Sequence, residues 1–403
     1  MSELSKAGKG RKATAGETWP ATADNASNRH EARHRPIDLD EAKALLLPFL
    51  GSAPRILLAV SGGPDSIALM RLSSLTAKVQ SVAELHAATV DHGLRENSRT
   101  EAERVGAWAR ECGVAHTVLS WEGRKPSARI QERARSARYA LLDARAREIG
   151  ATHLITAHTL DDQAETVLMR MARGSGIAGL AGMRAFSERR GLVHARPFLG
   201  VPKARLLATC RAHRWPFVDD PSNQDPRFAR ARWRRLAPAL AREGLTAERL
   251  AKLAERAASA EEALHLKAEA AFTAACIEDG NDGLILDMER IMPREPREVT
   301  LRILLQALRR ITGEHASPIR LERAEAFLDA LSTAFRAQKT LKRTLGGALL
   351  AYDGVQGLRL RREAERRRGR KREGGVPKPA LPARCRKASQ ANQGNSIALS
   401  ALV

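Results

Sequence analysis

The segment Ser61-Gly62-Gly63-Pro64-Asp65-Ser66 constrains the fold of this chain more than any other feature. It follows the short apolar run Arg55–Val60 and precedes a helical pattern that begins at Ser66. Two glycines let the backbone approach a ligand closely, and amides at the start of a helix are ready donors to an anion. A plain tight turn between strand and helix is the weaker alternative. We therefore interpret the segment as a phosphate-binding loop.

The residue types in this loop indicate which phosphate chemistry it serves. Ser61 and Ser66 add hydroxyl donors, and Asp65 is explained if Mg²⁺ bridges its carboxylate to the phosphates. The Gly-Lys-Ser/Thr ending of a Walker loop does not follow, so ordinary chemistry on a γ-phosphate is disfavoured.

Strand and helix patterns alternate through the first half of the chain. Short apolar runs lie at 55–60, 85–90, 115–119 and 152–157, and helical patterns lie between and after them, at 101–112, 130–149 and 161–172. This alternation predicts an α/β fold with a doubly wound parallel sheet covered on both faces. Ligands of such sheets bind at the carboxyl ends of the strands, which is where the polar clusters of this chain fall.

Composition divides the chain into four predicted parts. Residues 1–36 and 361–403 read as disordered basic tails, and 37–235 as the catalytic α/β domain. Residues 236–360 read as a helical connector and a small α-rich C-terminal domain, in which 344–360 has the glycine punctuation of a hairpin.

Charge and cysteine usage narrow the class of protein. Lys and Arg number 68 against 46 Asp and Glu, a net charge of +22, which favours a polyanionic partner, with nucleic acid first and an anionic membrane second. The four cysteines are far apart and form no Cys-x-x-Cys pair, which disfavours a zinc knuckle, a dithiol or a disulfide scaffold. No apolar run is long enough to span a membrane, so we expect a cytoplasmic protein without a membrane partner.

The segment 61–66 resembles the loop of the N-type ATP pyrophosphatases, or PP-loop enzymes. Further stretches, spanning about 55–235 in the family's order, resemble one member family, the tRNA(Ile)-lysidine synthetases. These are Val-Asp-His-Gly-Leu-Arg at 90–95, Ala-Arg-Ser-Ala-Arg-Tyr at 134–139, His-Thr-Leu-Asp-Asp-Gln-Ala-Glu-Thr at 158–166, Arg-Gly-Ser-Gly at 173–176 with Gly-Leu-Ala-Gly-Met at 179–183, and Asp-Asp-Pro-Ser-Asn at 219–223.

The resemblance implies a ligase that forms a carbon–nitrogen bond. The C2 oxygen of the wobble cytidine in tRNA(Ile) with a CAU anticodon would attack the α-phosphate of ATP. The ε-amine of free L-lysine would then displace AMP from the adenylated base and form lysidine. ATP is the co-substrate and Mg²⁺ the implied cofactor. A homodimer is an arrangement that the sequence leaves open.

The resemblance also implies site residues. Asp65 and Asp162 would be catalytic and would hold Mg²⁺. The ATP site would comprise Ser61, Gly62, Gly63, Pro64, Asp65, Ser66, Asp91, His92, Arg135 and His158. Lysine and tRNA would be bound by Glu165, Arg173, Gly174, Ser175, Gly176, Asp219, Asp220, Asn223, Arg230 and Arg234.

Several of these residues also have a structural interpretation. Asp161 or Asp162 could be an ordinary helix N-cap, and Asp219 and Asp220 could cap a turn. Arg135 and Arg138, three apart on a helix, could be solvated arginines. A helix C-cap explains one glycine of the 173–183 stretch but not four, which favours a flexible loop that closes over substrate.

The chain departs from the family pattern at two positions. Thr159 stands where the family commonly has a second His, and Ala231 stands where it often has Asn after Arg230. The role of the second His is therefore unfilled at position 159, and any contact that the Asn side chain makes in the family is absent at position 231.

Two other functions compete with the ligase. A tRNA thiolase shares the loop, but most such enzymes need a reactive cysteine pair or a cysteine-bound iron–sulfur cluster, whereas Cys112 and Cys210 are isolated. A non-catalytic RNA-binding protein with a degenerate nucleotide fold is the other alternative, and the intact loop argues against it.

Overall fold

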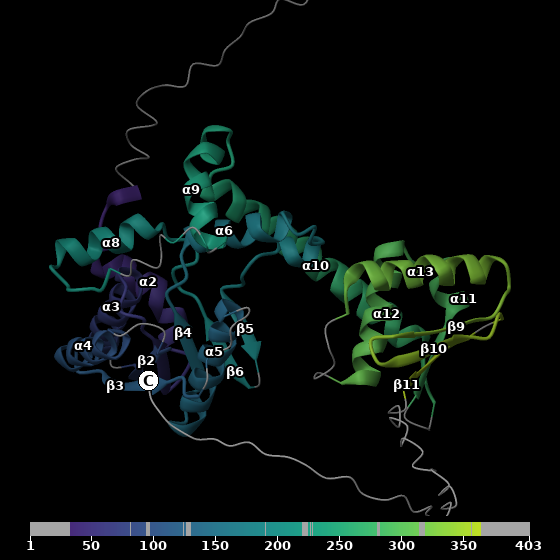
Figure 1. The fold of residues 1–403 in the computed structure, drawn as a ribbon, viewed down its shortest axis with the longest axis horizontal. Coiled ribbons are helices and arrows are strands. Elements are labelled where there is room, and N and C mark those ends of the chain that lie inside the picture. Colours follow the sequence, from purple (N-terminus) through teal and green to yellow (C-terminus); the bar gives the residue numbers. More distant parts are fainter. Residues whose placement is uncertain are drawn as a thin grey trace, which may run out of the picture. The chain divides into compact units, whose positions relative to one another are not determined.

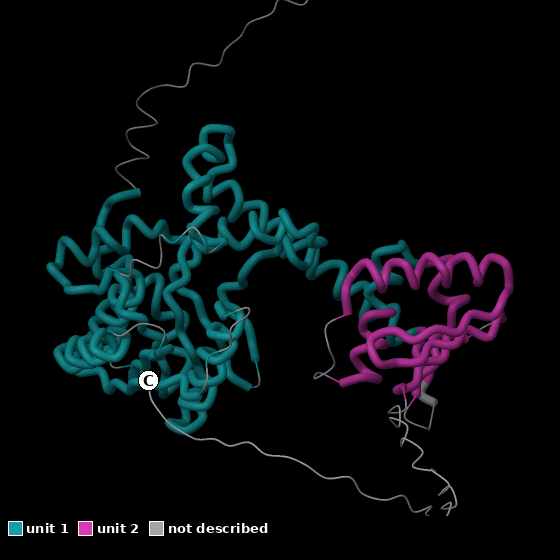
Figure 2. Tube along the Cα trace, in the orientation of Figure 1, with its two compact units in different colours: residues 1–274, 295–303 teal, residues 275–294, 304–403 magenta. Residues whose placement is uncertain are grey.

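The computed structural model describes residues 33–80, 82–93, 97–123, 125, 130–189, 191–219, 225, 227, 229–279, 283–313, 319–355 and 357–363. The chain forms two compact units (Figure 2): residues up to 274 together with 295–303, and residues 275–294 together with those from 304 onward. Most of the two predicted tails lies outside the described residues, and the predicted domain boundaries stay a prediction. Within the described part, Arg33 forms an ion pair with Glu248 at 2.6 Å, and Arg361 and Arg362 belong to a strand.

The first unit is built on a six-stranded sheet (Figure 1). Its strands, in spatial order, are β3 (Ala115–Ser120), β2 (Glu84–Asp91), β1 (Arg55–Ala59), β4 (His153–Thr156), β6 (Leu192–Ala195) and β5 (Phe186–Arg189). All neighbours are parallel except β5 and β6, which pair as an antiparallel hairpin at one edge. The predicted parallel α/β sheet is confirmed, and the antiparallel edge is an addition to it.

Helices cover both faces of this sheet, as the alternation along β1 demonstrates. Ile56 and Leu58 pack into one core cluster with residues of α2 (Leu39–Leu50), α3 (Pro64–Gln80), α4 (Ser98–Glu111) and α8 (Lys203–Ala212). Leu57, between them, packs into a second cluster with residues of α5 (Ile130–Glu148). Successive side chains of a strand point to opposite faces, so a strand that is apolar throughout requires two helix layers.

A third cluster attaches the helices that follow the sheet. Val167 and Leu168 of α6 (Leu160–Met171) pack against Leu250 and Ala254 of α10 (Ala247–Ala275) and against α9 (Ala229–Arg242). The predicted helical connector is therefore confirmed as α9 and α10. This packing fixes α9 beside α6, whose first turn carries the Asp-Asp pair. The short α7 (Ile177–Leu180) lies in the glycine-rich stretch after α6.

The second unit contains a five-stranded antiparallel sheet of order β7-β8-β11-β10-β9. Its elements are β7 (Cys276–Asp279), β8 (Gly283–Asp287), α11 (Met288–Ile291), α12 (Arg297–Thr312, shared with the first unit), α13 (Leu321–Arg336), β9 (Leu341–Leu345), β10 (Ala348–Tyr352) and β11 (Gly357–Arg362). The predicted helices and terminal hairpin are present. The expectation of an α-rich region overlooked β7 and β8, which are too short for their alternation to stand out.

The hairpin between β9 and β10 turns at Gly346 and Gly347, whose φ angles are +61° and +84°. Two consecutive positive φ angles match the tight turns that strand twist favours, and glycine adopts them without steric cost. None of the helices in the described part of the chain is both long and apolar enough to cross a bilayer.

Two leucines of α3 provide a matched test of this core. Leu69 is fully buried, whereas Leu75 is 41% exposed. We expect Leu69→Ala to lower the free energy of unfolding by about 2–5 kcal/mol, because it removes buried methyl groups and leaves a cavity. Leu75→Ala should cost less than about 1 kcal/mol. Urea denaturation followed by circular dichroism measures both, and equal losses would contradict the two-layer packing around α3.

Candidate functional site

The loop at 61–66 joins β1 to α3 and requires glycine at position 62. Gly62 has a φ of +91°, and its carbonyl accepts a hydrogen bond from the Val218 amide at 2.9 Å. A Cβ at this position would lie 3.1 Å from Val105 Cγ2 and 3.3 Å from Val218 Cγ2. Both the backbone angle and the space therefore exclude a side chain.

The two serines of the loop have different surroundings. Ser66 is buried; its hydroxyl donates to the Gly63 carbonyl at 2.9 Å and accepts from the Ser61 amide at 3.2 Å. Ser61 is exposed, and its Oγ lies 3.3 Å from that of Ser66. Ser66 therefore braces the loop. α3 begins inside the loop, at Pro64, and the amides of its first turn lack intrahelical acceptors.

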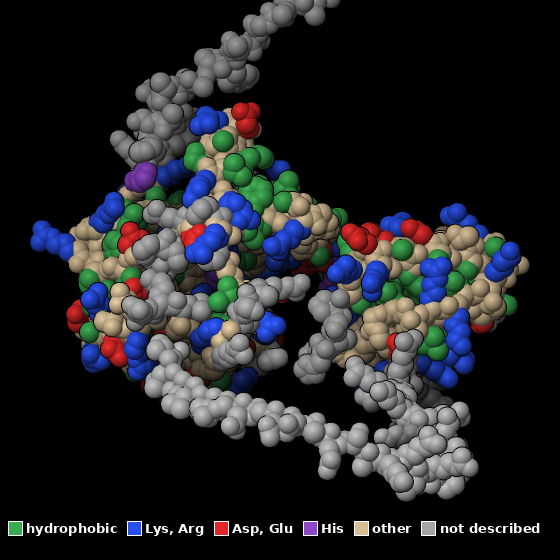
Figure 3. Space-filling view, in the orientation of Figure 1, with side chains coloured by type: hydrophobic (Ala, Val, Ile, Leu, Met, Phe, Trp, Pro, Cys, Tyr) green, Lys and Arg blue, Asp and Glu red, His purple; other side chains and the backbone are tan. Residues whose placement is uncertain are grey.

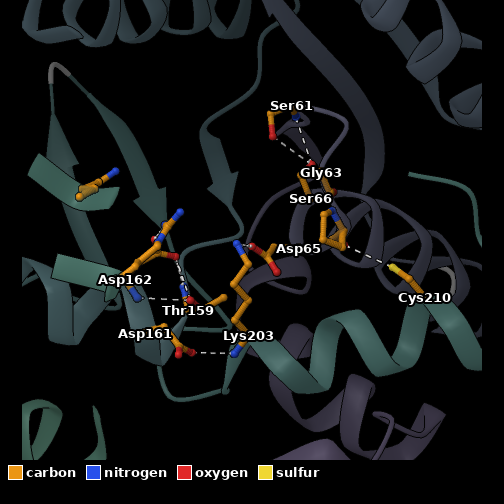
Figure 4. Close-up of polar contacts among 12 residues, drawn as sticks. Ser61, Gly63, Asp65, Ser66, Thr159, Asp161, Asp162, Lys203 and Cys210 are labelled. Atoms are coloured by element: carbon orange, nitrogen blue, oxygen red, sulfur yellow. Dashed lines mark hydrogen bonds and ion pairs between the residues drawn. The ribbon is translucent and has the colours of Figure 1, made fainter. Parts of the chain in front are cut away.

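Asp65 lies in the first turn of α3, opposite the start of α8 (Figure 4). Its Oδ2 is 3.0 Å from Lys203 Nζ, and the Lys203 amide donates to Asp161 Oδ2 at 2.8 Å. Burial raises the pKa of Asp65 above its ordinary value of 3.8; Lys203 opposes this rise, and the charges of Asp162 and Asp161 add to it. The ammonium group of Lys203 thus offsets the effect of burial on Asp65 only in part.

The other oxygen of Asp65 is not occupied by the residues around it. Oδ1 is buried and has no hydrogen-bond partner among the described residues. No cluster of three or more His, Cys, Asp or Glu that could enclose a metal occurs in the part of the chain that the structure describes. Mg²⁺ typically uses one or two carboxylates together with phosphate oxygens and water, so this donor set fits Mg²⁺ that arrives with a nucleotide.

Asp162 takes part in the capping of α6. The N-cap of this helix is Thr159, and Asp162 Oδ2 accepts from the Thr159 amide and hydroxyl, each at 2.9 Å (Figure 4). The two residues form a capping box. Thr159, which is fully buried, therefore occupies the family's second-histidine position as a cap. Neither aspartate is the N-cap, and Asp161 instead holds the first turn of α8.

The remaining oxygen of Asp162 faces positive charge. Oδ1 lies 3.7 Å from Arg234 Nη2. Burial by itself would raise the pKa of Asp162, but His158 and the hydrogen bonds from Thr159 outweigh it, and the pKa is lowered. Asp162 is therefore an ionised carboxylate at neutral pH.

Glu165, one turn further along α6, is buried and paired across to α9. Arg234 Nε donates to its Oε1 at 2.5 Å, and Arg230 Nε lies 3.9 Å from its Oε2. Arg230 and Arg234 are four residues apart and so share one face of α9. Burial nevertheless raises the pKa of Glu165, and Arg234 counteracts it. Ala231, at the second departure from the family pattern, is buried in the same helix.

The end of β2 contributes two further predicted residues. Asp91 Oδ1 accepts from the Gly93 amide at 2.9 Å and from Ser98 Oγ at 2.7 Å, so it shapes the turn. His92 Nε2 lies 3.0 Å from Arg138 Nη2. Burial and the charge of Arg138 lower the pKa of His92 to about 4, so the ring is neutral at pH 7.

Arg135 extends from α5 toward the same region. Its guanidinium lies 5.0 Å from the centre of the Tyr139 ring. Its positive charge helps to lower the pKa of His158 and of His194. The prediction that Arg135 belongs to the site is therefore consistent with its position, whereas its contact with ATP stays a prediction.

The structure adds residues that the sequence analysis did not identify. Thr156 Oγ1, at the end of β4, lies 2.7 Å from His158 Nδ1 and 3.0 Å from His194 Nε2. His194, on β6, is buried, and its Nδ1 lies 2.9 Å from Arg196 Nη2. A second histidine thus stands beside His158 in space, 6.3 Å between ring centres. Its only sequence signal is its position two residues before the Arg-Pro-Phe stretch.

The glycine-rich stretch after α6 is attached to that helix. Gln163 bonds both the amide and the carbonyl of Met183, at 2.8 and 2.9 Å, and Arg170 Nη1 donates to the Gly179 and Gly182 carbonyls. The predicted binding residues at the start of this stretch lie at the surface: Arg173, Gly174 and Gly176 are exposed, and Ser175 is half-buried. Asp219 is exposed, whereas the predicted Asp220 and Asn223 lie outside the described residues.

The thiols near the loop are not reactive. Cys210 Sγ lies 3.3 Å from the Pro64 carbonyl, but burial raises the pKa of this thiol to about 12. Burial also raises the pKa of Cys112. Neither thiol forms a thiolate at neutral pH, so neither is suited to sulfur transfer.

The raised pKa of Asp65 generates a pH prediction. A carboxyl whose pKa is higher in the folded than in the unfolded state stabilises the fold at low pH, and this contribution is lost as the pH rises through the folded value. Asp65→Asn should therefore gain stability relative to the unsubstituted chain as the pH rises above the ordinary carboxyl value of 3.8. Urea denaturation across that range measures the difference.

Asp225 offers a control of opposite sign. A hydrogen bond from Arg227 lowers the pKa of this carboxyl, so Asp225→Asn should lose stability relative to the unsubstituted chain as the pH rises. The same slope for both variants would refute the assignment of burial as the main influence on Asp65.

Comparisons with known proteins identify the family of this chain. The sequence model of the PP-loop domain family matches residues 38–240. A tRNA(Ile)-lysidine synthase of Methylobacterium nodulans is 49% identical over 338 residues, which cover 83% of this chain and 98% of the relative. One of Bradyrhizobium sp. is 46% identical, covering 80% and 94% of the two chains. The solved U34-tRNA thiolase NcsA of Methanococcus maripaludis matches 54% of this chain and 78% of its own at 17% identity, with a TM-score of 0.47. With the PP-loop matched over half its length and relatives aligned almost from end to end, this chain belongs to the tRNA(Ile)-lysidine synthase family.

Proposed function

We propose that this enzyme joins L-lysine to the wobble cytidine of tRNA(Ile) with a CAU anticodon. The C2 oxygen of the cytidine attacks the α-phosphate of ATP and pyrophosphate leaves. The lysine ε-amine then attacks C2, AMP leaves, and lysidine forms. The observation that carries the proposal is the placement of Asp65, on the PP-loop, within electrostatic range of the ionised Asp162. A cytoplasmic location follows from the proposed substrate.

The loop 61–66 supplies the nucleotide contact. Its glycines leave room for phosphate oxygens, and the first-turn amides of α3 donate to them. Arg135, His92 and His158 supply further donors from α5, β2 and the end of β4. Positive and neutral donors around the leaving pyrophosphate stabilise the charge that develops there.

Asp65 would hold Mg²⁺ through its buried Oδ1. The ion, when bound with ATP, offsets the charge of the phosphates and of the departing pyrophosphate. Asp162 would complete the site through Oδ1, because its Oδ2 is occupied by the cap of α6.

Asp162 is also suited to receive the proton of the lysine amine. An ε-ammonium must lose a proton before its nitrogen can attack, and an ionised carboxylate at hydrogen-bond distance both attracts and deprotonates it. Glu165 and Arg234 would position the lysine beside this carboxylate, because their own pair fixes both side chains.

The tRNA would lie against basic side chains of the first unit. Figure 3 shows Lys and Arg side chains over α9 on the visible face. Arg173 lies in the stretch after α6, and Arg230 lies on α9. Both could contact backbone phosphates of the tRNA and leave the anticodon base free to enter the site. The predicted domain boundaries and a homodimer remain part of this proposal.

Incorporation of labelled lysine into a tRNA(Ile) transcript tests the function. With ATP and Mg²⁺, the unsubstituted chain should label the wobble cytidine and release AMP. Asp65→Asn should abolish both, because it removes the carboxylate that faces the phosphates. Asp40→Asn, whose side chain is 93% exposed on α2, should leave both unchanged.

The other outcomes each name a different function. Release of AMP that depends on tRNA but not on lysine would transfer the second substrate to the thiolase alternative. Binding of tRNA with neither activity would support the non-catalytic alternative. Either result contradicts the proposal.

Asp162→Asn separates the two chemical steps. Its loss as a proton acceptor should slow lysine attack by about 10²–10⁴-fold, whereas adenylation, to which Asp162 contributes only the second proposed Mg²⁺ ligand, should slow less, so adenylated tRNA accumulates. Rapid-quench measurement of both species in one reaction provides the comparison. Loss of adenylation by the same factor would contradict the role of Asp162 as the proton acceptor of the amine, and circular dichroism checks that the variant retains its helices.

A further inference from the structure

A chain of hydrogen bonds leads from a buried arginine to His158. Arg196 Nη2 lies 2.9 Å from His194 Nδ1, His194 Nε2 lies 3.0 Å from Thr156 Oγ1, and Thr156 Oγ1 lies 2.7 Å from His158 Nδ1. Thr156 lies on β4, His194 lies on β6 and Arg196 follows β6 directly. Arg196, His194 and Thr156 are all buried.

The donor and acceptor properties of these groups determine which atom donates in each hydrogen bond of the series. A guanidinium only donates, so His194 Nδ1 must accept and its proton must be on Nε2. His194 Nε2 then donates to Thr156 Oγ1. Among the described residues, His158 Nδ1 is the one acceptor left for the hydroxyl proton of Thr156, so that a satisfied hydroxyl donates to this nitrogen. A neutral His158 consequently carries its proton on Nε2.

Arg196 itself is held in place. Its Nη1 donates to the Arg184 carbonyl at 2.7 Å and lies 3.2 Å from Ser187 Oγ. The guanidinium therefore cannot turn away from His194 without losing these bonds. Burial lowers the pKa of both histidines, so the rings are neutral at pH 7 and the tautomer is a meaningful property.

The free end of the chain is His158 Nε2. His158 is half-buried, and Nε2 has no hydrogen-bond partner among the residues that the structure describes. The charges of Asp162, Arg135 and Arg230 act on this ring, which places it in the site already described. An N–H at this position is a donor available to an anionic ligand.

We propose that Thr156, His194 and Arg196 are positioning residues that hold His158 as the Nε2–H tautomer, a donor to the phosphate of the bound nucleotide. The identity of the phosphate ligand rests on the proposed function, whereas the tautomer does not. In the opposite tautomer, Nε2 would present a lone pair to a phosphate oxygen, which repels it.

The tautomer is measured directly on the full chain with ¹⁵N-labelled histidine. Long-range ¹H–¹⁵N correlation spectra distinguish a protonated ring nitrogen from an unprotonated one, and the His158→Gln variant identifies the His158 signals. We expect Nδ1 of His158 to be unprotonated and Nε2 to carry the proton at pH 7, without ATP or tRNA. A proton on Nδ1 would overturn the proposal whatever the activity of the enzyme.

Variants of the threonine test the relay itself. Thr156→Val removes the hydroxyl, and a measurable fraction of the Nδ1–H tautomer of His158 should appear. Thr156→Ser should retain the Nε2–H tautomer. Thr152→Val is the matched control, because Thr152 Oγ1 also bonds a histidine, His153, at 2.9 Å but lies outside the relay. An unchanged His158 spectrum in Thr156→Val would overturn the role of Thr156.

The kinetic consequence follows from the same variants. Thr156→Val should raise the KM for ATP in proportion to the Nε2–H tautomer that is lost, by up to about tenfold when one hydrogen bond to a charged group is lost, while Thr156→Ser should leave the KM unchanged. A shifted tautomer with an unchanged KM would show that His158 does not donate to the nucleotide, and would overturn that half of the proposal alone.

Discussion

Burial of β1 on both of its faces is the constraint on which the rest of the first unit depends. Ile56 and Leu58 require one helix layer and Leu57 requires another, so the strand must lie in the interior of the sheet. Its neighbours β2 and β4 are parallel to it, and their carboxyl ends open at the same edge. Three polar segments that are distant in sequence, at 61–66, 91–92 and 158–162, are thereby brought to one place.

The meeting of these segments concentrates negative charge at the carboxyl ends of the strands. Asp65, Asp161 and Asp162 come from two helix starts, where helix dipoles favour carboxylates. Asp161 and Asp162 are each occupied by a cap, and Lys203 balances Asp65 from α8. The raised pKa of Asp65 shows that the balance is incomplete, and a site that binds a nucleotide with its cation is built on such an imbalance.

The arginines of α9 illustrate how a second element completes the site. Their helix packs on α6 through apolar residues, and the packing places Arg230 and Arg234 against Glu165 and Asp162. In the sequence these arginines belong to a basic run that a solvated helix face would explain equally well. Only their partners on α6 distinguish them from the exposed arginines of the same helix.

The sequence by itself determined the parallel sheet, the phosphate loop and the positions of Asp65, His158 and Asp162, because these depend on local patterns: an apolar run, two glycines and a cap at a strand end. It did not determine β7 and β8, because β8 joins the sheet by pairing with β11, about 70 residues away, nor did it determine the relay of Thr156, His194 and Arg196. Those bonds join β4 to β6, and only the order of strands in the folded sheet makes them neighbours. The tertiary structure also decided the role of Thr159. From the sequence it is a missing histidine, and in the fold it is the buried cap of α6, because a helix start beneath the site needs a hydroxyl to satisfy its amides.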